Sequence, residues 1–273
     1  MPLSITSIRR YPVKSCRGQD LTEAVVEPWG LAGDRRWMIV DADGSPLTAR
    51  ERPQLVLVTP SFDGTVMTLT APGAPVLTVK VPADGDLVPV DVWRYPLLAA
   101  FAGQEAAAWL TGVAGEPVRL VYLDDPTRRQ VDPDYGQDGD RVSFADGYPL
   151  LLTTDASLAA LNDLIAAGPH PAQAPLPMTR FRPNVVVGGS QPWAEDSWQR
   201  LQIGDVAFRV AKGSDRCVFT TVDPETAVKG KEPLATLARH RRWDGKVWFG
   251  VNLIPDDLPP DATIRLGDPV TIR

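Results

Sequence analysis

The fold class follows from residues 54–73, which read QLVLVTPSFDGTVMTLTAPG. In this stretch apolar residues alternate with polar ones on both sides of Asp63 and Gly64. Alternation with a period of two is typical of half-buried strands, and Asp-Gly is a preferred pair for a tight hairpin turn. The stretch therefore predicts two strands joined by a turn at residues 63–64.

The same pattern extends through the first half of the chain. Residues 35–49, RRWMIVDADGSPLTA, predict a strand, a turn around Asp43-Gly44 and a second strand. Residues 75–82 and 87–96 predict two more strands. Residues 96–115, PLLAAFAGQEAAAWLTGVAG, are rich in alanine and end in glycine, which predicts a helix.

The second half begins near residues 118–126 and mixes further strands with short helices. Residues 127–149 predict a long loop, and residues 150–168 predict a helix capped by Thr154 or Asp155. Four prolines make residues 168–178 a loop. A short helix is predicted within residues 232–242, and further strands are predicted at 184–189, 201–211, 217–223, 246–254 and 263–273. Many strands with few helices indicate a mostly β, α+β protein built from barrels or sandwiches.

Size and composition exclude several classes of function. A chain of 273 residues forms one large domain or two ordinary ones. With 34 acidic and 28 basic residues and a net charge of −6, it lacks the basic excess of a nucleic-acid binder. No secretory signal and no apolar run of about 20 residues is visible, and two cysteines do not make a disulfide scaffold. These features predict a cytoplasmic protein without a membrane partner.

The common catalytic motifs are absent from the sequence. There is no G-x-G-x-x-G, no phosphate-binding G-x-x-x-x-G-K-[ST], no G-x-S-x-G and no C-x-x-C. The two histidines, His170 in the proline-rich loop and His240 at a basic helix end, have no nucleophile motif near them. A hydrolase based on a histidine is therefore disfavoured.

One basic cluster could hold a phosphate. The segments VKSCRG (13–18) and GDRRW (33–37) supply Lys14, Arg17, Arg35 and Arg36 beside small residues. Guanidinium and ammonium groups are the usual partners of phosphate oxygens. Composition alone favours a solvated, charged strand edge over a phosphate site, and both interpretations stay open at this point.

Two further clusters have both a functional and a structural reading. In RFRPN (180–184), Arg182 precedes a proline and Asn184 follows it, a pair that could contact a planar heterocycle or tie down a loop. In SDRC (214–217), Arg216 could favour a thiolate at Cys217 that binds a soft metal or attacks an electrophile. Cys217 could also be a small buried apolar residue at the start of a strand.

The order of these clusters resembles the MOSC-domain proteins over residues 3 to 272. It is most similar to the group of the mitochondrial amidoxime reducing component and the bacterial N-hydroxylated-base reductases. The motifs that carry the resemblance are YPVKSCRG (11–18), GLAGDRRWMIVDADGSPLTARERPQL (30–55), RFRPNVVV (180–187), WAEDSWQRLQIGD (193–205), DRCVFTTVDPETA (215–227) and EPLATL (232–237). It implies an N-terminal β-rich domain over residues 1–123, packed on a MOSC β-barrel domain over residues 124–273, with a cofactor between them.

The resemblance also implies the cofactor and the residues that hold it. The cofactor is the molybdenum cofactor, a pyranopterin dithiolene, and Cys217 is its protein ligand on the metal. Asp215 is expected near the open metal position. The residues expected to bind the cofactor are Lys14, Ser15, Arg35, Thr154, Ser157, Arg182, Asn184 and Arg216.

The activity implied is reduction of the N–O bond of N-hydroxylated compounds. No cysteine-rich ferredoxin-like domain follows within the sequence, so a separate donor is expected to supply the electrons: a ferredoxin, a flavin reductase or a cytochrome b5-type carrier. Two alternatives remain: a carrier that delivers the cofactor without turnover, and a sulfur-transfer protein with a persulfide on Cys217. No nucleic-acid polymer is expected as a partner.

Overall fold

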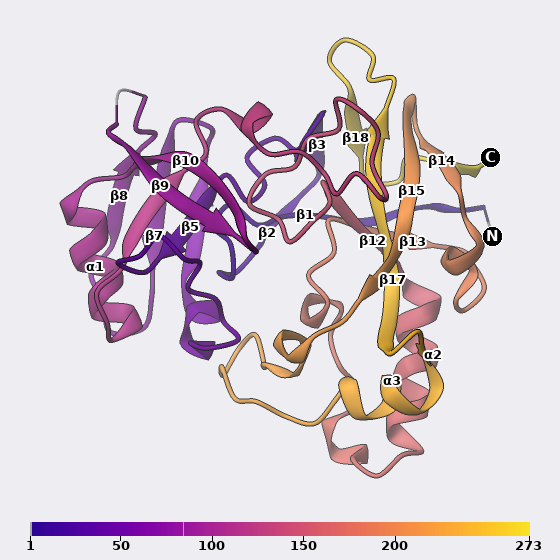
Figure 1. Ribbon diagram of the computed structural model, residues 1–273. Helices are drawn as coiled ribbons and strands as arrows, with labels where there is room; N and C mark the ends of the chain where they lie inside the picture. The colour runs from indigo at the N-terminus through magenta and orange to yellow at the C-terminus, as the bar shows by residue number, and fades with distance from the viewer. Residues whose placement is uncertain (1, 84) are drawn as a thin grey trace.

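The computed structural model describes residues 2–83 and 85–273 and has two lobes (Figure 1). Within these residues it contains many strands and three α-helices, which confirms the predicted mostly β, α+β class. One lobe holds strands β5 to β11 with helix α1 (Gln104–Ala114), and the other holds the largest sheet with helices α2 (Asp155–Ala166) and α3 (Leu234–His240).

The largest sheet contains nine strands, drawn mainly from the second half of the chain. β12 and β13, which are connected through helix α2, pair in parallel. All other pairs in the sheet are antiparallel. Bonds from Ile5 N to Asp268 O and from Val270 N to Leu3 O bring the first strand against the last. In spatial order the strands are β19 (Val270–Ile272), β14 (Arg200–Ile203), β15 (Val206–Asp215), β17 (Lys246–Asp256), β12 (Leu150–Thr154), β13 (Val185–Gly188), β1 (Ser4–Arg10) and β2 (Gln19–Leu21), with β16 (Arg242–Trp243) on β17.

Three smaller sheets complete the fold. The four-stranded sheet has the order β5 (Trp37–Val40), β11 (Arg119–Tyr122), β10 (Tyr95–Phe101), β9 (Leu87–Val92). The three-stranded sheets are β6 (Thr59–Phe62), β7 (Val66–Thr70), β8 (Leu77–Lys80) and β18 (Thr263–Arg265), β3 (Glu23–Glu27), β4 (Gly30–Leu31). Each lobe has its own core, one centred on Trp37, Leu55 and Met67 and the other on Ile8, Leu152 and Phe208.

The hairpin predicted at residues 63–64 is confirmed. β6 and β7 pair in antiparallel register, and Asp63 Oδ1 accepts bonds from Thr65 N and Val66 N at 2.8 Å each. The predicted strand before it was wrong in its first half, because residues 53–57 form the 3₁₀ helix η1 (Pro53–Leu57). Proline at its first position fixes φ and has no N–H to give to a strand ladder.

Three other predicted elements were wrong. The second strand expected after the turn at Asp43-Gly44 is only an isolated bridge between Val40 and Pro46. Residues 96–101 were expected to begin a helix but belong to strand β10 (Tyr95–Phe101), which pairs with β9; the helix starts only after Gly103. Residues 217–223 were expected to be a strand but contain the 3₁₀ helix η6 (Val218–Thr221). There Thr220 and Thr221 donate their hydroxyls to the carbonyls of Cys217 and Val218, which offers the backbone an alternative to a ladder.

The predicted helix cap is confirmed at Thr154, whose Oγ1 accepts a bond from Ser157 N at 3.2 Å. The division of the chain at residues 123/124 stays a prediction. Strands β1 and β2, although they come first in the sequence, belong to the sheet of the second lobe. The segments that follow β1, β4 and β15 therefore meet where the two lobes join.

Candidate functional site

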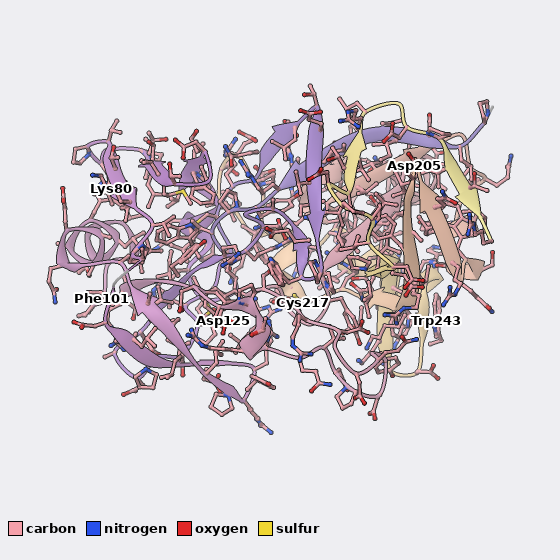
Figure 2. All side chains as sticks on the ribbon, turned by 90° about the horizontal axis from the view of Figure 1, so that it is seen from above. Lys80, Phe101, Asp125, Asp205, Cys217 and Trp243 are labelled. Carbon is pink, nitrogen blue, oxygen red and sulfur yellow. The ribbon has the colours of Figure 1, made fainter. Side chains whose placement is uncertain are left out.

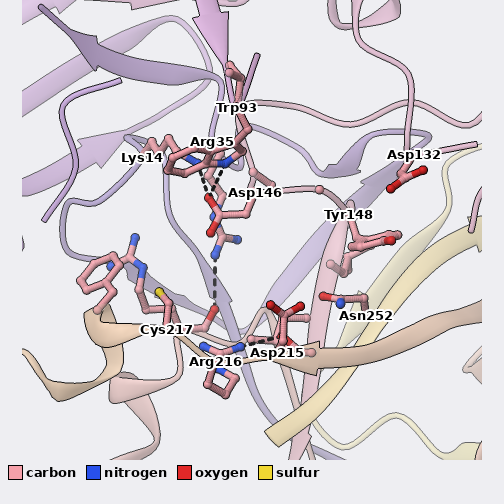
Figure 3. Close-up of a pocket in the computed structure, with 18 of the residues that line it drawn as sticks. Lys14, Arg35, Trp93, Asp132, Asp146, Tyr148, Asp215, Arg216, Cys217 and Asn252 are labelled. Atoms are coloured by element: carbon pink, nitrogen blue, oxygen red, sulfur yellow. Dashed lines mark hydrogen bonds and ion pairs between the residues drawn. The ribbon is translucent and has the colours of Figure 1, made fainter. Parts of the chain in front are cut away.

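A cavity of about 850 Å³ is lined by segments of both lobes. Eight basic side chains line it against three acidic ones, a basic surplus in a chain whose net charge is −6. Such a surplus favours an anionic ligand. The basic residues are Lys14, Arg35, Arg50, Arg129, Arg180, Arg182, Lys212 and Arg216; the acidic ones are Asp132, Asp146 and Asp215. Figure 3 shows ten of the lining residues labelled.

Lys14 lies at the wall of this cavity with Ser15 beside it in the chain. The segment after β1 places it there, and its side chain is only 7% exposed. Lys14 Nζ donates to Phe144 O at 2.8 Å and to Asp146 Oδ1 at 2.5 Å. Burial lowers the pKa of Lys14 to about 8, although the nearby Asp146 carboxylate partly counteracts it. At neutral pH Lys14 is therefore mostly charged and close to its titration point.

Two guanidinium groups lie over the buried ring of Tyr11. Arg35 lies 4.4 Å and Arg182 4.1 Å from the ring centroid, close enough for cation–π attraction. Arg35 Nη2 donates to Arg182 O at 3.3 Å, and Arg182 Nη1 donates to Cys16 O at 2.7 Å. Burial lowers the pKa of Arg182 to about 10, which leaves it charged at neutral pH.

Asn184 ties this pair to the sheet. Its Oδ1 accepts from Arg35 Nη1 at 2.9 Å and from Leu151 N at 3.1 Å, and its Nδ2 donates to Arg9 O at 3.2 Å. Of the two roles open for Asn184, these bonds support the tying role. Asn184 lines the cavity and orients Arg35 within it.

Cys217 and Arg216 follow directly after the end of β15. Arg216 Nη1 donates to Ser214 Oγ at 2.7 Å and Nη2 donates to Phe181 O at 2.6 Å, while its buried Nε has no protein partner within the described residues. Burial lowers the pKa of Arg216. Cys217 has an extended backbone (φ −113°, ψ 178°) and directly precedes η6. Its side chain lies in the cavity wall and is partly exposed.

Arg50 is a site residue that the sequence reasoning missed. Its Nε donates to Cys217 Sγ at 3.2 Å, and its Nη2 donates to Asp146 Oδ2 at 3.0 Å. Its guanidinium lies 4.5 Å from the Trp93 ring centroid. The signal was present, since Arg50 lies inside the motif 30–55, but no spacing rule connects it with Cys217, 167 positions later.

Asp146 is the second missed residue, and it connects Lys14 with Arg50. Partial desolvation in the cavity alone would raise the pKa of Asp146, but the charges of Lys14 and Arg50 hold it well below its usual range. The buried Arg129 fixes the loop that carries it: Nη1 donates to Ser143 O and Ala145 O, each at 2.5 Å, and Nη2 to Asp146 O at 2.9 Å. Residues 127–149 gave no local pattern from which this contact could be predicted.

The structure does not bring Thr154 and Ser157 to the cavity. Both are fully buried at the start of α2, where Thr154 Oγ1 lies 3.1 Å and Ser157 Oγ 2.8 Å from Glu195 Oε2. Thr154 caps the helix, and both hydroxyls bond one oxygen of the buried Glu195 carboxyl group. Arg17 and Arg36 also point elsewhere: Arg17 pairs with Glu225 at 2.9 Å, and Arg36 donates to Leu123 O at 2.9 Å. The other predicted site residues line the cavity together, namely Lys14, Ser15, Arg35, Arg182, Asn184, Asp215, Arg216 and Cys217.

Comparisons with known proteins identify the family. A family model described as "MOSC N-terminal beta barrel domain" matches residues 3–117, and one described as "MOSC domain" matches residues 139–271. The chain is 35% identical to human "Mitochondrial amidoxime-reducing component 1" over 95% of its own length and 80% of that protein. It is 34% identical to rat "Mitochondrial amidoxime reducing component 2" over 98% and 82%. This chain belongs to the MOSC family.

Among solved structures, the YUAD protein from Bacillus subtilis is similar to this MOSC protein over 99% of the chain and 94% of its own. The identity is 9% and the TM-score 0.38. Within the described residues, no helix has both the length and the apolar character that a membrane crossing needs.

The residues of the MOSC cavity fit an anionic cofactor that carries a soft metal. The basic surplus suits a phosphate, and the Nε of Arg216 is a buried donor that a ligand could satisfy. The Cys217 sulfur in the same wall is the ligand type that soft metals prefer. Lys14, Ser15, Arg35, Arg182 and Arg216 could hold such a cofactor, and Cys217 could hold its metal.

Proposed function

We propose that this MOSC protein is a molybdenum-cofactor-dependent reductase of N-hydroxylated compounds. The observation that supports it most is the convergence of the Cys217 sulfur and eight basic side chains on one cavity. The relatives that match over most of the chain are named for amidoxime reduction. The reaction is R–NHOH + 2 H⁺ + 2 e⁻ → R–NH₂ + H₂O, with the N–O bond broken and its oxygen released as water.

The bound cofactor supplies the two-electron chemistry, and the chain supplies its binding and orientation. In this proposal Lys14, Ser15 and Arg35 hold the phosphate end, and Arg182 and Arg216 line the rest of the anion. Cys217 is the metal ligand. Its partner Arg50 fixes the direction of the sulfur, as outer partners of metal ligands generally do.

The substrate occupies the part of the cavity away from Cys217. Figure 3 shows Tyr148, Asp132 and Asn252 on that side, with Asp215 between them and Cys217. The Asp215 side chain is 45% exposed and lies near Lys212 and Lys246, at 4.0 and 3.6 Å. In this proposal Asp215 passes protons from solvent to the oxygen that leaves as water. Electrons come from a separate carrier protein of the ferredoxin, flavin reductase or cytochrome b5 type.

The test is molybdenum and pterin content together with turnover. Wild type, Cys217→Ala and the matched control Cys16→Ala are produced in a host that makes the cofactor, then assayed with benzamidoxime and reduced methyl viologen. Cys16 is the other cysteine, fully buried. We expect metal, pterin and turnover in wild type and control, with turnover lost in Cys217→Ala.

Other outcomes contradict the proposal in different ways. Metal and pterin without turnover in the wild type would indicate a cofactor carrier and contradict a reductase. A persulfide on Cys217 without pterin would indicate a sulfur-transfer protein. Full turnover in Cys217→Ala would show that Cys217 is not a required ligand of the metal.

A further inference from the structure

The protein surface next to Cys217 has an unusual composition. Val218, the next residue, is 44% exposed, and Val228 is 64% exposed. Lys229 and Lys231 are exposed as well. These four residues, Val218, Val228, Lys229 and Lys231, are called the valine–lysine patch below. Exposed apolar side chains bordered by charges are typical of protein interaction sites.

A β-bridge and backbone hydrogen bonds join the valine–lysine patch to the turn that carries Cys217. Val222 forms a β-bridge with Lys229, Asp223 N donates to Val228 O at 2.8 Å, and Gly230 N donates to Thr221 O at 2.9 Å. Residues 228–230 therefore run back beside η6. The same turn lines the cavity with Cys217 and presents Val218 to solvent, so one peptide bond separates the proposed metal ligand from the surface.

The patch itself carries two positive charges, and two acidic residues beside it are already paired. Asp223 pairs with Arg180 at 2.9 Å, and Glu225 pairs with Arg17 at 2.9 Å. Lys231 makes no ion pair within the described residues, and Lys229 Nζ donates only to Arg50 O, at 2.8 Å. In a chain of net charge −6, this local cationic surface complements an acidic partner.

We propose that the valine–lysine patch is the docking surface of an acidic, one-electron carrier protein that reduces the site. This rests on the proposed function. Two successive encounters each transfer one electron from the reduced carrier, which leaves oxidised, and together they supply the two electrons of one N–O reduction. The apolar centre at Val218 and Val228 brings the carrier against the turn of Cys217, and the lysines orient it.

A second exposed cluster is the rival location. Trp243 is 43% exposed and stacks on Trp248 with ring centroids 5.7 Å apart, and Arg239 and Arg242 lie on the same segment. This cluster meets the cavity across the pair of β15 and β17, where Trp248 is in register with Asp215. Figure 2 shows Trp243 well to one side of Cys217. The valine–lysine patch is favoured because Val218 is bonded directly to Cys217.

The experiment compares two electron sources at two salt concentrations. Turnover of benzamidoxime is measured with a reduced acidic [2Fe–2S] ferredoxin and, separately, with reduced methyl viologen, which needs no docking surface. The variants are Val228→Glu and Lys231→Glu. Their matched controls are Val76→Glu, at 66% exposure, and Lys80→Glu, which Figure 2 shows at the far end of the other lobe.

We expect kcat/KM for ferredoxin to fall about tenfold in each patch variant at ~0.01 M ionic strength, and the difference to shrink at ~0.15 M, where charges are screened beyond about 8 Å. The viologen rate and both control variants should match the wild type. Equal losses in patch and control variants would overturn the proposal. So would a loss in Arg242→Glu without one in Lys231→Glu, which would move docking to the tryptophan cluster.

Failure of the two proposals can be told apart. Viologen turnover without ferredoxin turnover in the wild type would overturn the acidic carrier and leave the reductase intact. No turnover with viologen would overturn the reductase and the docking proposal with it. If Val228→Glu also lost viologen turnover, the substitution would have damaged the site itself, and Val228→Ser would be tested in its place. An unchanged ferredoxin rate in Val228→Ser would refute an apolar contact at this position.

Discussion

Asp146→Asn tests the charge network that joins the two lobes. The wild-type carboxylate lies 2.5 Å from Lys14 Nζ and 3.0 Å from Arg50 Nη2. Without it, Lys14, at 7% side-chain exposure, keeps only Phe144 O as a hydrogen-bond partner for its ammonium group among the described residues. A hydrogen bond to a charged group contributes roughly 1.5–3 kcal/mol. Because the Asp146 side chain is itself 62% exposed and partly screened, we expect a loss of about 2 kcal/mol.

The size of this loss depends on pH through Lys14. Burial lowers the pKa of Lys14 to about 8, below the value of the unfolded chain, and removal of Asp146 lowers it further. Below the pKa of the variant, its folded state holds Lys14 as a poorly paired charge, so the loss of stability is full. Above about pH 8, Lys14 is neutral in both folded proteins, and the difference that it causes disappears.

The assay is urea denaturation of wild type and Asp146→Asn at about pH 6.5 and about pH 9.5, with the slope m compared to confirm equal unfolding. The expected loss is about 2 kcal/mol at the lower pH and below ~1 kcal/mol at the higher, where only the exposed pair with Arg50 remains. Asp205→Asn, an exposed carboxylate shown in Figure 2, is the control and should change stability by less than about 0.5 kcal/mol. Equal losses at both pH values, or none at the lower one, would refute the reasoning.

Three further predictions concern single side chains. Arg50→Gln removes the donor to Cys217 Sγ, so viologen-driven turnover should fall about tenfold to a hundredfold, while Arg52→Gln should leave it unchanged. Sulfate binding to the cofactor-free protein, followed by calorimetry, should weaken by up to about tenfold per pH unit above about pH 8, and Lys14→Arg should abolish this pH dependence. Burial raises the pKa of Glu195, so Glu195→Gln should gain stability relative to wild type as pH rises from about 4.5 to neutral in urea titrations; a constant difference would show that Glu195 does not titrate there.

Much of the fold could be predicted because local chemistry agreed with tertiary structure. The Asp63-Gly64 hairpin and the Thr154 cap depend on bonds between residues no more than three apart, and both formed. The predictions failed where contacts between residues far apart in the sequence determine the secondary structure. Residues 96–101 have the composition of a helix, but β9 offers them a complete ladder, and tertiary pairing overrides a weak local preference.

The residues of the candidate site also fall into two groups, those that a local motif indicates and those that only distant contacts bring together. Lys14, Arg182 and Cys217 could be singled out because each stands in a short polar motif in an otherwise apolar context. Arg50 and Asp146 could not, since their partners are 167 and 132 positions away and no periodicity connects them. Thr154 and Ser157 show the opposite error: a polar helix start suggested a ligand, whereas the hydroxyls serve a buried carboxyl group.

The backbone at the site gives an independent reason to treat the cavity as a preformed receptor. Ser15, Arg35 and Arg182 have left-handed backbones, with φ of 71°, 45° and 57°, and each lines the cavity. Such conformations cost non-glycine residues about 1–3 kcal/mol and persist where surrounding contacts enforce them. Here the strained residues enforce one another: Arg35 bonds the carbonyl of Arg182, and Arg182 bonds the carbonyl of Cys16, next to Ser15. The folded chain thus bears the cost of gathering like charges before any anion arrives, and the bound anion then gains the attraction of groups that need no rearrangement.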